Sequence, residues 1–234
     1  MERFRGYVQQ REAAIQSARI RGEHFLWTDE SEARLELVKS GEVVIQPAGK
    51  KGFTEIEGGL VHDWRGAAFI PNTTLAKVLA LVQDYDNHKN IYAPEVVRSR
   101  VLAREGGDFK IFLRLVKKKV ITVVLDTYHD VHYSSLDQNR AYSRSFTTRI
   151  SEIAGAGTAK ERPQPPGSDH GFLWNLNSYW RFQQRDGGVY LECEAISLTR
   201  DVPTGLGWLI MPIIRDLPKE SLQNALTATR MGIH

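Results

Sequence analysis

Two histidines lie three residues apart in the segment His129-Asp-Val-His132, and they are the first candidates for chemistry in this chain. The segment belongs to a run of alternating apolar and polar residues that predicts a β-strand. Residues three positions apart on a strand point to opposite faces of the sheet, so these two imidazoles cannot bind the same metal ion. We therefore expect no metal site here.

The single cysteine of the chain, Cys193, falls on the apolar face of another predicted strand, where a thiol is normally inert. One cysteine can form neither an internal disulfide nor a multi-cysteine metal site. The sequence also lacks a Gly-x-Ser-x-Gly segment and a phosphate-binding glycine loop. We therefore expect neither a nucleophilic active site nor a bound cofactor.

The elements that must position these side chains follow a simple order. A strand at 60–70 precedes a pair of helices between Pro71 and Pro94. Strand-like segments then follow at 95–104, 109–117, 120–133, 140–153, 172–184 and 189–199. The short connections between them imply antiparallel pairing, so the predicted fold class is α+β.

The two ends of the chain are predicted to be helical. Residues 1–57 form a helical extension whose apolar faces are too small to fold alone, so we expect it to pack on a main domain at 58–234. A terminal helix begins near Pro203, and Pro212 and Pro218 are expected to divide it.

Two stretches carry a resemblance to a known superfamily. The first runs from Thr74 to Leu102, where a helix, a corner at Asp84-Tyr-Asp86 and a short helix lead into Tyr92-Ala-Pro94 and the next strand. The second runs from Trp180 to Pro203, a hairpin that leads into the closing helix. In this layout residues 58–231 resemble the START-like superfamily, which includes polyketide cyclases, coenzyme Q-binding proteins and lipid-transfer domains.

The resemblance implies a helix-grip fold, in which a curved antiparallel sheet wraps around a long C-terminal helix. The helical pair is then a two-helix insertion after the first strand of the domain, and the first quarter of the chain is an N-terminal helical extension. The resemblance also implies a mostly apolar cavity between the sheet and the C-terminal helix.

Strand alternation indicates which side chains face this cavity. The odd positions of 121–133 form an apolar face, and Trp180 lies on the apolar face of 172–182 together with Trp174. The same reasoning places residues of 140–153 and of the first strand inward, although both faces of these strands are mixed. The predicted ligand-binding residues are His62, Trp64, Leu125, His129, Tyr133, Tyr142, Arg144, Trp180 and Trp208, the last from the closing helix.

Three functions fit these residues. The first is a non-catalytic binder or carrier of a lipid, isoprenoid quinone or similar apolar ligand, with His129, Tyr142 or Arg144 holding its polar end. The second is a cyclase, aromatase or dehydratase in which the same side chains polarise a carbonyl and move a proton. The third is a protein-interaction module whose cavity is filled by side chains.

The charge of the chain argues against nucleic acid as a partner. The formal net charge is +3, and no basic block is longer than Lys117-Lys118-Lys119. This triplet is expected to form a solvated hairpin tip, with transient attraction to an anionic membrane surface as the alternative. No feature indicates a protein partner.

The sequence shows no targeting or membrane-spanning signal. The N-terminal residues 1–6 lack the apolar core of a signal peptide, and the longest apolar run, 206–214, is too short to cross a bilayer. The default expectation is a cytoplasmic protein, unless an export signal has been removed from the chain.

Overall fold

The computed structural model describes residues 2–20, 24–49, 51–118, 122–165, 168–200 and 207–233, with 207–213 described by their backbone only. The strands are β1 (Val44–Pro47), β2 (Phe53–Ile56), β3 (Gly59–Pro71), β4 (Val96–Glu105), β5 (Asp108–Lys118), β6 (Thr122–Ser135), β7 (Arg140–Ala154), β8 (Arg162–Pro163), β9 (Asn175–Arg185) and β10 (Gly188–Arg200). They pair along the path β1-β3-β10-β9-β7-β6-β5-β4, with β2 added to β3 and β8 to β7.

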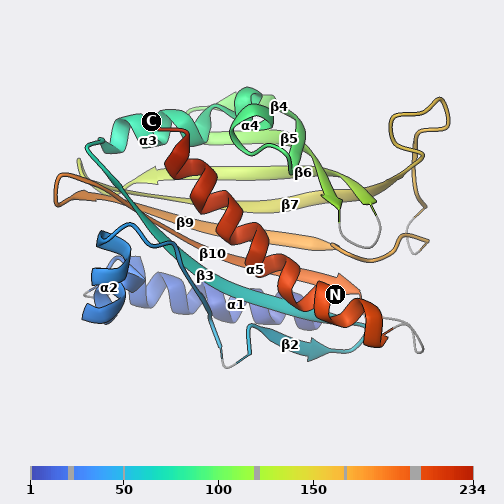
Figure 1. Cartoon of the computed structure of the whole chain (residues 1–234), viewed down its shortest axis with the longest axis horizontal. Helices are drawn as coiled ribbons and strands as arrows, with labels where there is room; N and C mark the ends of the chain where they lie inside the picture. The colour runs from blue at the N-terminus through green and yellow to red at the C-terminus, as the bar shows by residue number, and fades with distance from the viewer. Residues whose placement is uncertain are drawn as a thin grey trace.

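The helical elements are α1 (Glu2–Ile15), its π-helical continuation η1 (Gln16–Ile20), the 3-10 turn η2 (Trp27–Glu30), α2 (Glu32–Lys39), α3 (Leu75–Gln83), the 3-10 turn η3 (Tyr85–Asn87), α4 (His88–Ile91) and α5 (Gly207–Met231). All strand pairs of the sheet are antiparallel, and α5 crosses its face diagonally (Figure 1). The helix pair α3 and α4 closes one end of the space between the sheet and α5. The predicted α+β helix-grip fold is confirmed.

Helix α5 is continuous, so the expectation that Pro212 and Pro218 divide it was wrong. A proline inside a helix removes one backbone hydrogen bond and crowds the preceding turn. Packing offsets this cost, because Leu222 and Leu226 are buried against the sheet. Their side chains occupy the position that a side chain at Gly66 of β3 would fill. In most proteins such tertiary packing, more than propensity, stabilises a helix.

The first quarter of the chain contributes strands as well as helices. β1 and β2 both pair with β3, so the segment before residue 57 is built into the sheet. The division of the chain at this residue stays a prediction. Within the described part of the chain, no helix combines the length and apolar character needed to cross a membrane.

Helix α1 covers the face of the sheet opposite α5. Its Phe4 and Val8 are buried against Val61 of β3 and Ile196 of β10. Polar contacts add to this apolar interface. The Arg11 guanidinium lies 2.8 Å from the Asp63 carboxylate and also pairs with Glu194, and both carboxylates are almost fully buried. Paired charges therefore help to hold the N-terminal helix on the outer face of the sheet.

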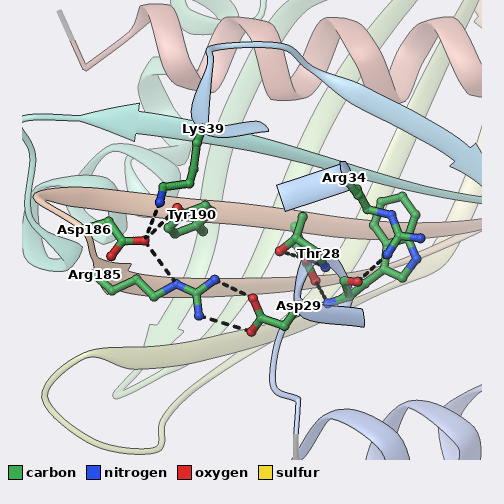
Figure 2. A network of polar contacts seen from close by, with 9 residues as sticks. Thr28, Asp29, Arg34, Lys39, Arg185, Asp186 and Tyr190 are labelled. Carbon is green, nitrogen blue, oxygen red and sulfur yellow. Dashed lines mark hydrogen bonds and ion pairs between the residues drawn. The ribbon is translucent and has the colours of Figure 1, made fainter. Parts of the chain in front are cut away.

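A second polar network fastens the segment after α1 to the β9–β10 hairpin. Figure 2 shows the Arg185 guanidinium donating to the carboxylate of Asp29, while the hydroxyl of Tyr190 donates to Asp186 at 2.9 Å. Deeper in the sheet, the Glu192 carboxylate accepts the backbone N–H groups of residues 27 and 28, each at 2.7 Å. These contacts hold the N-terminal segment on the outer face and leave the inner face to α5.

Candidate functional site

Two adjoining cavities lie between the inner face of the sheet and α5. The larger has a volume of about 460 Å³ and lies next to the helix pair; we call it the large lobe. The smaller, of about 260 Å³, lies beside the middle of α5; we call it the small lobe. Both linings include His129, Ser178 and Trp180, so the two lobes meet at these residues. The volume of the large lobe is within the range of small-molecule sites.

Small side chains on facing walls create this space. Across the sheet, Ser145 of β7 is in register with Ser178 of β9, which is in register with Ala195 of β10. On α5, Ala225 and Ala228 line the cavity opposite them. Protein interiors are normally close-packed, so a row of small residues facing another leaves room that larger side chains would fill.

The remaining walls are mostly apolar. The large lobe is bounded by apolar side chains from α3, β5, β6 and β9, which are Val82, Ile111, Leu113, Val131, Leu176 and Phe182. The small lobe is bounded by others from β5, β6, β10 and α5, which are Leu115, Val123, Leu125, Cys193, Ile214, Leu217 and Leu222. Burial raises the pKa of the Cys193 thiol well above its usual value, so this group stays protonated.

His129 is the central polar group of the cavity. Its Nε2 lies 2.9 Å from the Thr127 hydroxyl oxygen, and its Nδ1 lies 3.4 Å from the Ser145 hydroxyl oxygen. Burial lowers the pKa of His129 to about 4, because the apolar surroundings disfavour the charged imidazole. At neutral pH this side chain is therefore uncharged.

A tyrosine pair closes the large lobe beneath the helix pair. The Tyr85 and Tyr133 hydroxyls lie 2.9 Å apart, and Tyr133 also donates to the backbone carbonyl of Val82 at 3.3 Å. The hydroxyl of Tyr92 lies 3.0 Å from that of Thr229 on α5. Burial raises the pKa of Tyr133 well above 10, so the phenol remains a neutral hydrogen-bonding group.

A polar clamp joins the sheet edge to α5 where the two lobes meet. We use this name for Glu95, Lys117, Ser221 and Asn224. The Lys117 ammonium pairs with the Glu95 carboxylate and donates to the Ser221 hydroxyl at 2.7 Å, and Asn224 donates to Glu95 at 2.8 Å. Lys117 was expected at a solvated hairpin tip. Instead it lines the small lobe, since β5 extends to Lys118 and brings it beneath α5.

Four predicted residues lie in the lobes. Leu125 lines the small lobe, Tyr133 the large lobe, and His129 and Trp180 line both. Strand alternation placed them correctly, because β6 and β9 each have one apolar face along these positions. Whether they bind a ligand remains a prediction.

Two further predicted residues, His62 and Trp64, lie near α5 without lining the lobes. His62 and Trp64 face α5 from β3, as expected; His62 is fully buried, and Trp64 is partly buried against the cluster that contains Leu222 and Leu226. The Nε2 of His62 lies 3.0 Å from the Thr199 hydroxyl oxygen, and burial, with a contribution from the Arg215 charge, lowers its pKa to about 4. Trp208 belongs to α5, and its side chain lies outside the described residues.

The inward placement of Tyr142 and Arg144 was wrong. Both line a small depression under α1 on the outer face, whereas Ser143 and Ser145 of the same strand face the large lobe. The apolar side of β7 points outward because the N-terminal segment covers it. Trp174 was also misplaced, since it precedes β9 and packs in the outer cluster with Phe4.

Sequence reasoning missed the small residues that give the cavity its space and the residues of the polar clamp. Ser145 and Ser178 carry no pattern that distinguishes them from surface serines. Glu95 and Asn224 lie 129 positions apart, so local periodicity could not bring them together. Among the residues that the structure describes, no group of three or more ligating side chains is arranged for a metal ion.

Solved structures share this architecture. A protein of Thermus thermophilus superimposes with a TM-score of 0.52 at 16% identity, covering 72% of this chain and 94% of that one. A fragment of the STAR-related lipid transfer protein of Xanthomonas axonopodis gives a TM-score of 0.51 at 16% identity, covering 78% of this chain and 98% of that one. No protein-family model and no curated protein sequence matches the chain. The chain has the START-like fold, and at these identities the similarity establishes the fold alone.

Proposed function

We propose that the protein binds a small hydrophobic molecule in the two lobes and holds or carries it without converting it. The observation that carries this proposal is the pair of adjoining, mostly apolar lobes, the larger of about 460 Å³. Apolar burial would supply most of the affinity, at roughly 25 cal/mol for each Å² removed from water. The similarly folded Xanthomonas axonopodis protein is described as a lipid transfer protein, which agrees with a ligand of this kind.

The polar groups favour binding over catalysis. The enzymatic interpretation relied on His129, Tyr142 or Arg144, and of these three only His129 faces the lobes. A general acid or base works best when its pKa is near the working pH. Burial lowers the pKa of His129 to about 4, so it accepts a proton poorly at neutral pH. These properties suit a fixed hydrogen-bonding group.

The volume of the lobes favours a ligand over a filled interaction module. A filled core would place large side chains along the inner rows of the sheet. Ser145, Ser178 and Ala195 occupy these positions instead, and Ala225 faces them. Transient contact of the protein with an anionic membrane surface stays a prediction.

A cavity-filling variant tests the proposal. Ser178→Phe adds a ring where the lobes meet, so it should abolish the fluorescence gain of an apolar, environment-sensitive dye while leaving the circular dichroism spectrum unchanged. Ser151→Phe is the matched control, because Ser151 is in register with Asp126 on the outer face. Equal dye binding by the wild type and Ser178→Phe would show that the lobes are not the binding site.

A further inference from the structure

The proton positions around His129 restrict the chemistry of the ligand, given the proposed binding function. The Thr127 hydroxyl oxygen lies 3.1 Å from the carbonyl oxygen of Leu113 and 2.9 Å from Nε2 of His129. A carbonyl oxygen only accepts hydrogen bonds, so the one hydroxyl proton of Thr127 is donated to Leu113. The Thr127 oxygen therefore accepts at the other contact, and Nε2 of His129 carries the proton.

The other imidazole nitrogen is then an acceptor. A neutral histidine carries one N–H, and this proton is already placed on Nε2, so Nδ1 presents a lone pair. The hydroxyl oxygen of Ser145 lies 3.4 Å from Nδ1, which is long for a hydrogen bond. Both His129 and Ser145 line the large lobe, so a better donor inside the cavity could bond to Nδ1.

The charged side chains of the lining already pair with each other and do not favour a charged ligand. Of the lining residues that the structure describes, only Glu95 and Lys117 carry ionic side chains, and they pair with each other. A charged ligand group would lose its hydration without finding an unneutralised opposite charge, which costs several kcal/mol. The lobes therefore suit an uncharged molecule.

We infer that the ligand is an uncharged, apolar alcohol whose hydroxyl group donates its proton to Nδ1 of His129. Because His129 lines both lobes, the hydroxyl lies where they meet, and the apolar parts of the molecule extend from there into the lobes. A ketone, quinone or ester oxygen would instead face the lone pair of Nδ1 and compete with it for the Ser145 proton. The hydroxyl of an alcohol can donate its proton to Nδ1 and accept the proton of Ser145, so it satisfies both groups.

A matched ligand series tests this inference. Dodecanol, its methyl ether, 2-dodecanone and dodecanoate are used to displace an apolar, environment-sensitive dye from the purified protein. We expect dodecanol to bind roughly tenfold more tightly than the ether or the ketone, because each of these leaves a buried acceptor without a donor. Dodecanoate should also bind more weakly than dodecanol.

Equal or tighter binding of the ether, the ketone or the carboxylate would overturn the inference while leaving the proposed function intact. If the dye and all four compounds fail to bind, the proposed function itself is wrong, and the inference falls with it. The two failures are therefore distinguishable in one titration.

Variants identify the acceptor. His129→Phe should reduce the preference for dodecanol over its ether to roughly one while keeping the affinity for the ether. Thr127→Val provides a second variant, because it frees the imidazole to carry its proton on Nδ1 and should weaken the preference for the alcohol over the ketone. His132→Phe, on the outer face of β6, is the control and should keep both preferences. Preferences that persist in both of the first two variants would overturn the inference.

Discussion

The hydroxyl groups of Tyr85 and Tyr133 lie 2.9 Å apart, and this contact joins the helix pair to strand β6 above the large lobe. Tyr133 donates its own proton to the carbonyl of Val82, so Tyr85 is the donor of the shared bond. The two tyrosines are therefore not equivalent, although they make the same contact.

This asymmetry predicts unequal effects of removing each hydroxyl. Tyr85→Phe deletes one hydrogen bond and should lower the free energy of unfolding by about 1 kcal/mol. Tyr133→Phe deletes two and leaves the buried Tyr85 hydroxyl without its acceptor, so the loss should be about 2 kcal/mol. Urea denaturation of both variants and the double variant checks this. Equal losses, or strictly additive ones, would argue against the contact.

Arg11 should be a pH-dependent contributor to stability. Its removal in Arg11→Ala leaves the buried carboxylates of Asp63 and Glu194 without the guanidinium that pairs with them, which should cost about 3 kcal/mol at about pH 8. Burial already raises the pKa of Asp63 to about 6, so this carboxyl takes up a proton on mild acidification and the loss should shrink at about pH 5.

Urea denaturation of Arg11→Ala at both pH values measures this difference. Arg5→Ala, at an exposed position of the same helix, is the control and should change stability little at either pH. A loss that is independent of pH would show that the buried carboxylates are not paired with Arg11.

Three buried histidines predict that the protein loses stability on acidification. Burial lowers the pKa of His62, His88 and His129 from 6.5 to about 4. Between these values the unfolded chain binds protons that the folded chain does not, so each group costs about 1.4 kcal/mol per pH unit as the pH falls. The raised pKa of Asp63, about 6, works in the opposite direction between pH 4 and 6 and offsets part of this loss.

Urea denaturation across this window measures the slope. The wild type should become less stable as the pH falls through the window, and His62→Gln should make the decline shallower. A stability that is flat or rises on acidification would mean that these imidazoles are not held neutral.

The polar clamp should control ligand exchange. Lys117→Met removes the contacts that tie β5 to Glu95 and to Ser221 of α5, so the helix should separate from the sheet more easily. We expect the dissociation rate of an apolar dye to rise several-fold in stopped-flow measurements, with a smaller change in the association rate. Lys118→Met, at the exposed neighbouring position, should leave both rates unchanged. Unchanged dissociation in Lys117→Met would exclude this role.

Much of the fold could be predicted from the sequence, because most strands have one apolar face. The odd positions of β6 are apolar or neutral, so Leu125, His129 and Tyr133 were correctly assigned to the face beneath α5. On β10 the same reasoning placed Cys193 inward and Glu192 outward, as the structure has them. A continuous apolar face is a local property, and local patterns are what sequence reasoning measures.

The assignment failed on β7 because its larger apolar side chains point outward and its small polar side chains point inward. Tyr142 and Phe146 lie on the outer face, where the N-terminal segment and Tyr179 pack against them. The inner face carries Ser143 and Ser145, which are small and polar because they border a cavity. The rule that the apolar side of a strand faces inward therefore selects the wrong side when the inner face borders a cavity. Which segment covers the outer face depends on long-range contacts that periodicity does not contain.

The most direct test of the account is native mass spectrometry of the freshly purified protein, followed by solvent extraction of whatever is released. The account predicts one apolar compound per chain, bound in the wild type and missing from Ser178→Phe. A wild-type protein that shows only its bare mass, even after incubation with lipid and fatty alcohol mixtures, would contradict a ligand-binding function for these lobes.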